Sequence, residues 1–183
     1  MVPLSRLLAV IGLALAAGCS GPVISHIDDR SPSIASYFRY YARDGAVAAE
    51  VHGAPPGVAP ADFAAAVADA LSPPAGYPPA RFVATAEPRG FRMVLMFGAP
   101  PAVSGSDACA NAAGMGLWPT ARPFRVQGAM CQGARVLTEA VGTLPVPPAG
   151  PGDQRFRALL DQLSWTLLPM PRPENGFELR PLG

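Results

Sequence analysis

The chain has no lysine and only two histidines, and 15% of its residues are charged. Histidine is the side chain most often used for general acid–base catalysis near neutral pH, so the sequence contains few candidates for that role. It also has no Gly-x-Ser-x-Gly elbow, no His-Glu-x-x-His motif and no Cys-x-x-Cys pair. Serine hydrolase, zinc protease and thiol redox signatures are therefore lacking. The sequence predicts no metal site and no cofactor.

The first 18 residues have the layout of an export signal. One basic residue, Arg6, precedes an apolar run from Leu7 to Leu15 that is too short to span a bilayer. Small residues follow at 16–18, and then Cys19. This order resembles the signal of bacterial membrane lipoproteins, with Leu15 one place before the position at which that family prefers leucine. The alternative is an ordinary secretory signal cut at an Ala-x-Ala-like site.

The resemblance implies that Cys19 becomes the first residue of the mature chain and carries a lipid anchor. Acyl chains contribute about 0.8 kcal/mol per buried methylene, so two or three chains hold a protein durably at a membrane. The next residue is Ser20 rather than Asp, which in this family favours the outer membrane over the inner one. The expected location is the periplasmic face of a bacterial outer membrane.

Charge and cysteine content fit an exported protein. Loss of Arg6 with the signal leaves as many Arg as the 13 acidic residues, so nucleic acid is not an expected partner. With Cys19 assigned to lipid, Cys109 and Cys131 remain as an even pair in a compartment that oxidises thiols. We therefore expect them to be bonded. A loop of this size, about twenty residues, gives roughly 3 kcal/mol of stabilisation by the chain-entropy estimate.

Three pairs of β-capable runs predict a sheet. Asp44-Gly45 is a strong hairpin signal, because both central positions of a type I′ turn require positive φ. The run from Met93 to Phe97 is apolar on both alternating faces and is the candidate central strand. The pairs are residues 37–43 with 46–52, 81–86 with 90–97, and 124–131 with 134–141.

Two helices complete the predicted domain. Pro60 suits the first position of a helix to Leu71. Asp153 can cap a second helix with an apolar stripe, which Pro169 ends. The order of elements lacks a regular βαβ alternation and predicts an α+β fold, an antiparallel sheet with two main helices packed on one face in two layers. The expected segments are a signal peptide (1–18), lipidated Cys19 with a tether (19–36), one domain (37–168) and a Pro-rich tail (169–183).

The densest cluster of aromatic and cationic residues covers positions 37–43. On a strand, Tyr37, Arg39 and Tyr41 would share one face. His52 ends the next predicted strand before a Pro/Gly loop, where functional side chains can emerge. These four residues are the candidate binding surface. The alternatives are a position near the membrane interface through the short tether, an ordinary edge strand with one packed face, and a structural histidine bonded to a backbone carbonyl.

The sequence leaves three functions open. The leading hypothesis is a non-catalytic lipoprotein that binds an envelope protein or a cell-wall component, and a solid core would favour it. The second is a periplasmic hydrolase, which convergence of His52 with a serine or carboxylate in a cleft would favour. The third is a carrier of a small ligand or lipid, with a dry cavity lined by Met93, Leu95, Phe97 and Leu160.

The lipoprotein hypothesis makes a direct prediction for Cys19→Ala. Without the thiol, no acyl chain can be attached, so the variant should accumulate as uncleaved precursor or be released from the membrane. Incorporation of labelled fatty acid and fractionation of the two membranes check this. Unchanged acylation and fractionation of the variant would rule out Cys19 as the anchor.

Overall fold

The structure, a computed structural model, describes residues 21–26, 28, 31, 34–86, 90–113, 115 and 123–170. The predicted signal peptide, the predicted lipidation at Cys19 and most of the predicted tail lie outside these residues. The strands are β1 (Val23–His26), β2 (Ala46–His52), β3 (Arg81–Ala84), β4 (Phe91–Phe97), β5 (Phe124–Gln132) and β6 (Arg135–Leu144). The helices are α2 (Ile34–Tyr41), α3 (Pro60–Ala70), α4 (Gly105–Asn111) and α5 (Gln154–Leu167), with a short 3-10 helix η2 (Ala42–Asp44).

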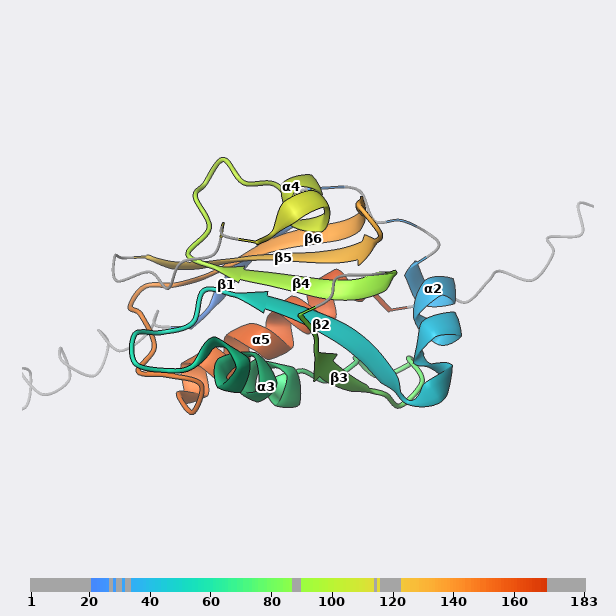
Figure 1. Cartoon of the computed structure of the whole chain (residues 1–183), viewed down its shortest axis with the longest axis horizontal. Coiled ribbons are helices and arrows are strands. Elements are labelled where there is room, and N and C mark those ends of the chain that lie inside the picture. Colours follow the sequence, from blue (N-terminus) through green and yellow to red (C-terminus); the bar gives the residue numbers. More distant parts are fainter. Residues whose placement is uncertain are drawn as a thin grey trace, which may run out of the picture.

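The strands form one mixed sheet in the order β1-β6-β5-β4-β2-β3 (Figure 1). β2 runs parallel to both β3 and β4, whereas β4, β5, β6 and β1 pair antiparallel in turn. The prediction of an α+β fold is confirmed, but the sheet is not antiparallel throughout. The reason is α3, which is long enough to carry the chain back across the sheet from β2 to a parallel β3.

Two of the three predicted strand pairings are wrong. β2 lies between β3 and β4, so the runs at 81–86 and 90–97 do not form a hairpin. Residues 34–41 form helix α2, in which buried Ile34 and Phe38 have helical spacing. Gly45 adopts a left-handed conformation (φ 75°) and donates to the carbonyl of Ala42, ending η2. A glycine with positive φ suits a helix C-terminus as well as a type I′ turn.

The other predicted elements agree with the structure more closely. β5 and β6 form the expected hairpin, with Gly133 at positive φ in its turn. Helix α3 begins at Pro60, and the side chain of Asp153 accepts a hydrogen bond from the Arg155 amide at the start of α5. By contrast, no strand was predicted at residues 23–26, which lie within the predicted tether; they form β1 and pair with β6.

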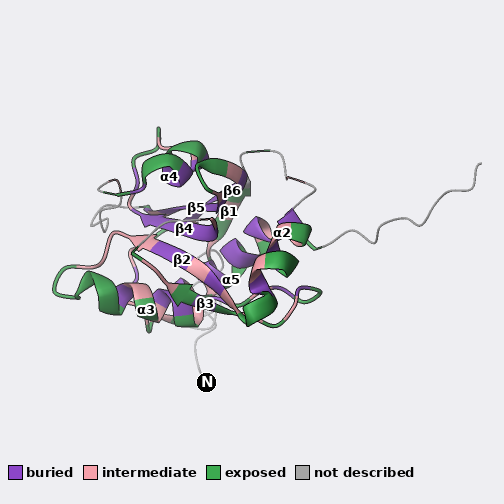
Figure 2. Ribbon diagram, turned by 45° about the vertical axis from the view of Figure 1, so that its right-hand side comes forward, coloured by how far each residue is buried: buried purple, intermediate pink, exposed green. Residues whose placement is uncertain are grey.

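Helices lie on both faces of the sheet. Successive side chains of β4 point to opposite faces of the sheet, as in any pleated strand. Met93, Leu95 and Phe97 belong to the main core with α2, α3 and α5, and Val94 and Met96 belong to a smaller core under α4. Figure 2 shows the buried central strands between helices with exposed outer sides. The predicted two-layer arrangement therefore omitted α4. In the described part of the chain, no helix has the length and hydrophobicity needed to cross a membrane.

Aromatic rings fill the space between the sheet and the helices. The ring centroid of Phe97 lies 5.1 Å from that of Phe63, 5.5 Å from that of Phe156 and 6.1 Å from that of Phe124. The four side chains proposed to line a carrier cavity, Met93, Leu95, Phe97 and Leu160, are fully buried in this core. They pack as core residues do in ordinary domains.

Phe156 provides a test of this packing. Phe156→Ala should lower the free energy of unfolding by about 3–5 kcal/mol, because it removes a ring from a closed core. Urea unfolding followed by circular dichroism measures the change. Trp165→Ala is the matched control on the same helix, since Trp165 is 50% exposed; it should change stability by less than about 0.5 kcal/mol. If the two substitutions lowered the free energy of unfolding equally, the assignment of Phe156 to the buried face and Trp165 to the exposed face of α5 would be wrong.

Candidate functional site

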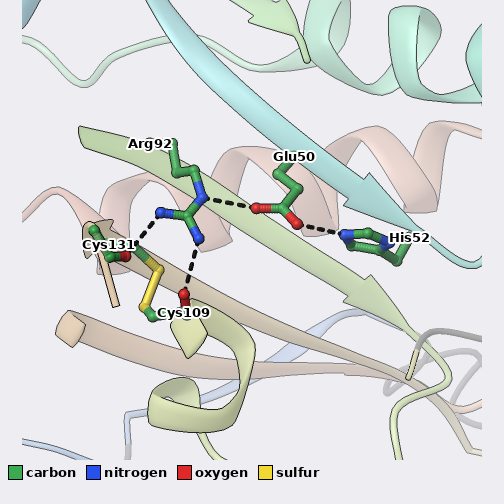
Figure 3. A network of polar contacts seen from close by, with 6 residues as sticks. Glu50, His52, Arg92, Cys109 and Cys131 are labelled. Carbon is green, nitrogen blue, oxygen red and sulfur yellow. Dashed lines mark hydrogen bonds and ion pairs between the residues drawn. A yellow bond between two sulfur atoms is a disulfide. The ribbon is translucent and has the colours of Figure 1, made fainter. Parts of the chain in front are cut away.

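A buried polar network occupies the α4 face of the sheet, between β2 and β4 (Figure 3). Arg92 Nε donates to Glu50 Oε2 at 2.7 Å, and His52 Nε2 is hydrogen-bonded to Glu50 Oε1 at 2.8 Å. The side chains of Arg92 and Glu50 are 4% and 6% exposed, and that of His52 is 21% exposed. The carboxylate is thus shared between an internal cation and an imidazole that reaches the surface.

Strand geometry brings these three residues together. Glu50 and His52 are two positions apart on β2 and so point to the same face. In the parallel pairing, Arg92 of β4 is opposite Ala48, which lies two residues before Glu50 on β2 and on the same face of the sheet. The long guanidinium therefore reaches Glu50 diagonally across the strand pair.

The guanidinium of Arg92 also holds two other parts of the fold. Nη1 donates to the carbonyl of Gly133 at 2.8 Å, in the β5–β6 turn, and Nη2 donates to the carbonyl of Cys109 at 2.9 Å, in α4. Cys109 and Cys131 form a disulfide that joins α4 to β5, as the cysteine count predicted. Arg92 and the disulfide together fix α4 on the sheet.

Burial and hydrogen bonding act in opposite directions on Glu50. Burial raises the pKa of its carboxyl group, but the hydrogen bonds from His52 and Arg92 outweigh it and bring the pKa below the ordinary 4.5. The carboxylate is therefore charged at neutral pH and compensates the charge of Arg92. Loss of Arg92 or of Glu50 would leave the charge of the other side chain inside the protein without its counterion.

A second polar group fixes the start of α4. The carboxylate of Glu139 accepts a hydrogen bond from the Gly105 amide, and Gln127 Nε2 approaches the same oxygen at 3.4 Å. A Cβ on Gly105 would lie 2.7 Å from Glu139 Cβ, so only glycine permits this close approach. Glu139 thus holds the first turn of α4, and the disulfide holds its last residues.

Sequence patterns did not single out Glu50, Arg92 or Glu139 as site residues. A signal was present, because each is an isolated charge within an apolar strand. Charges are rarely buried unless they are paired, so such positions indicate partners elsewhere in the fold. The partner of each could not be named without the strand order.

A shallow hollow of about 430 Å³ opens beside His52. It lies between the end of β2, the loop 53–58 and the start of α3, where Pro60 and Phe63 contribute to its wall. His52 supplies the one polar side chain among the described lining residues. The hollow can therefore offer a ligand apolar contact and one imidazole, with no serine, threonine or cysteine in its lining.

The structure separates the four residues of the candidate binding surface. The rings of Tyr37 and Tyr41 stack on Phe91, the first residue of β4, at centroid distances of 6.2 and 5.5 Å. Arg39 is exposed on the same helix. His52 pairs with Met96, five residues further along β4 and therefore about 16 Å away. His52 and the α2 residues do not form one surface.

Comparison of the chain with protein-family models, with curated proteins and with solved structures finds no match. Within the described residues, no cluster of three or more His, Cys, Asp or Glu side chains is arranged to hold a metal ion. An imidazole oriented by a carboxylate can accept a proton, whereas Glu50 and Arg92 are engaged with each other.

Arg92→Met tests the electrostatics of the network. The lowered pKa of Glu50 means that its pairing stabilises the folded state above pH 4.5 and that this contribution is lost as the pH falls through the folded-state pKa. The variant should lose about 3–5 kcal/mol at pH 7, because a buried carboxylate loses its cation. Burial should then raise the pKa of Glu50, so the variant should regain stability as the pH falls from about 7 to 5.

Urea unfolding at a series of pH values measures both effects. Arg81→Met is the matched control, since Arg81 is an exposed arginine at the start of β3. The control should keep the pH dependence of the wild type. Parallel stability curves for Arg92→Met and the wild type would contradict the assignment of Arg92 as the partner of Glu50.

Proposed function

We propose that this protein is a lipoprotein anchored through Cys19 at the periplasmic face of a bacterial outer membrane. Its domain acts as a non-catalytic module that binds an envelope protein or a cell-wall component. The observation that carries the binding role is an exposed aromatic and cationic pair on and beside α2. Tyr40 is 58% exposed, and the guanidinium carbon of Arg43 lies 4.9 Å from the centre of its ring.

The chemistry of this pair suits recognition. Tyrosine and arginine are enriched among the residues that dominate binding energy at protein interfaces. The ring of Tyr40 also contacts Tyr41 edge-on at 4.9 Å, and Arg39 extends from the same helix. We call Arg39, Tyr40 and Arg43 the α2 surface. It presents aromatic area and two guanidinium groups to a partner, with the exposed carboxylate of Asp44 3.8 Å from Arg43.

The α2 surface is held rigidly by the core beneath it. Phe38 is fully buried and makes edge contacts with Tyr77, Phe82 and Phe91 at 4.9, 6.4 and 6.2 Å. Tyr41 is tied to the β5–β6 hairpin by a hydrogen bond from Gln132. A surface that is ordered before binding loses less conformational entropy when a partner binds.

The polar network supports a structural role for the buried charges. Both oxygens of Glu50 are hydrogen-bonded, and Arg92 uses Nε, Nη1 and Nη2 on three separate acceptors. These groups are occupied in holding β2, β4, α4 and the β5–β6 turn together. The filled core between sheet and helices favours binding at the surface over carriage of a ligand inside.

A periplasmic hydrolase that uses His52 is the second candidate. The bond between His52 Nε2 and Glu50 favours it, because a carboxylate that orients an imidazole is a common part of general-base catalysis. The hollow beside His52 would receive the substrate. In this alternative, water rather than a side-chain hydroxyl would be the group that His52 activates.

A comparison of two variants separates these functions. Tyr40→Glu should abolish the cellular phenotype of the wild type by placing a negative charge within the α2 surface, while His52→Ala should leave it nearly intact. Complementation of a deletion strain at matched protein abundance measures both, since either change could otherwise act through stability. Loss of function in His52→Ala with normal folding and export would instead favour the hydrolase.

Site-specific crosslinking locates the contact itself. A photoreactive amino acid at position 40 should yield a crosslinked envelope component in cells. The same residue at position 83 should not, although Val83 is also exposed (41%). Equal crosslinking at both positions would contradict a specific α2 surface.

A further inference from the structure

One end of the sheet gathers three loops and the start of β1. β2 and β4 run in the same direction, and β5, β6 and β1 alternate with them. The loops after β2, β4 and β6 and the residues before β1 and β5 therefore lie at the same end, on the left in Figure 1. We call residues 21–23, 53–59, 98–104 and 145–152 the loop end.

The loop end has no charged residue. Its segments consist mainly of Pro, Gly, Ala and Val, with the sequences GAPPGVA at 53–59, GAPPAVS at 98–104 and PVPPAGPG at 145–152. Val23 is 59% exposed and Val58 is 37% exposed, and residues 100–102 are exposed as well. Exposed apolar side chains that gather at one end of a molecule are typical of a surface that contacts a partner or a membrane.

The opposite end of the sheet has a different character. Exposed Arg43 and Asp44 precede β2, Arg81 begins β3 and Arg135 begins β6. The α2 surface also lies at that end (Figure 1). The four segments of the loop end are therefore uncharged, whereas the opposite end carries exposed charges on its strand termini.

The length of the chain before β1 decides what can cover the loop end. Cys19 is two residues from Gly21, the first described residue, so their Cα atoms are at most about 7 Å apart. A lipid on Cys19 is thus held beside the loop end with no room for the domain to move far from the bilayer.

We propose that the loop end rests on the phospholipid bilayer that anchors the protein, with Val58 and the neighbouring Pro and Ala side chains in contact with lipid. This inference rests on the proposed lipidation of Cys19. The short connection keeps the loop end at high effective concentration at the bilayer surface, so even a contact too weak to bind a free domain is populated. Apolar residues at the level of the headgroups are favoured there.

Charges near the loop end define the kind of bilayer contact. Asp62, Asp107 and Asp153 lie in or before the first turns of α3, α4 and α5. Arg155 and Arg157 lie in the first turn of α5, where Arg155 pairs with Asp153 at 2.8 Å, and Arg125 is engaged with the carbonyls of Ala99 and Pro100. The three arginines are thus balanced by three carboxylates, and no net positive charge attracts this end to anionic lipid. The contact is therefore made by apolar side chains, and it needs neither anionic lipid nor low salt.

Tryptophan reporters in the lipidated protein test the proposal. The protein is purified from membranes, Cys19 lipidation is verified by mass spectrometry, and the protein is reconstituted in phosphatidylcholine vesicles with brominated acyl chains. Val58→Trp and Ala102→Trp place reporters in two separate loops of the loop end. Val83→Trp is the matched control, because Val83 has similar exposure and lies on β3, beside the first half of β2.

After subtraction of the emission of the unsubstituted protein, Val58→Trp and Ala102→Trp should lose fluorescence to the bromine atoms, and Val83→Trp should not. The loss should be the same at high salt and should not increase with phosphatidylglycerol. Equal emission losses in all three variants, or none, would overturn docking while the anchor stands. Quenching only on anionic vesicles would overturn the apolar contact. Absence of lipid on Cys19 would overturn both the anchor and the docking.

Discussion

The ion pair between Arg92 and Glu50 is the interaction on which the arrangement of the sheet and α4 depends. It places two opposite charges inside the protein, where neither is tolerated alone. Because Arg92 also donates to carbonyls in α4 and in the β5–β6 turn, one guanidinium links four segments that are distant in sequence. A shift of one residue between β2 and β4 would move Arg92 to the opposite face of the sheet from Glu50, so the ion pair disfavours that register.

The two faces of the sheet are stabilised by different kinds of interaction. The face under α3 and α5 is stabilised by aromatic and aliphatic packing, which is tolerant of small shifts in position. The face under α4 is held by directional bonds from Arg92, Glu139 and the disulfide. A short helix with small residues buries little apolar area, so α4 needs these bonds to remain in place.

Sequence patterns predicted the elements better than their partners. The apolar stripe of α5 and the hairpin of the adjacent strands β5 and β6 are local features, and both were predicted correctly. Asp44-Gly45 was ambiguous, because a left-handed glycine ends a helix as readily as it turns a hairpin. The site depended on which strands are neighbours. Glu50 and Arg92 are 42 positions apart, and their contact follows from a parallel pairing that no local pattern encodes.

The pairing of β1 with β6 has a consequence for the order of folding. Val23 and Thr143 are neighbours in the sheet although 120 positions separate them. β1, the first strand in the described part of the chain, therefore cannot join the sheet until the chain is present as far as β6. Long-range pairing of this kind is slow, so β1 is unpaired while the rest of the sheet forms.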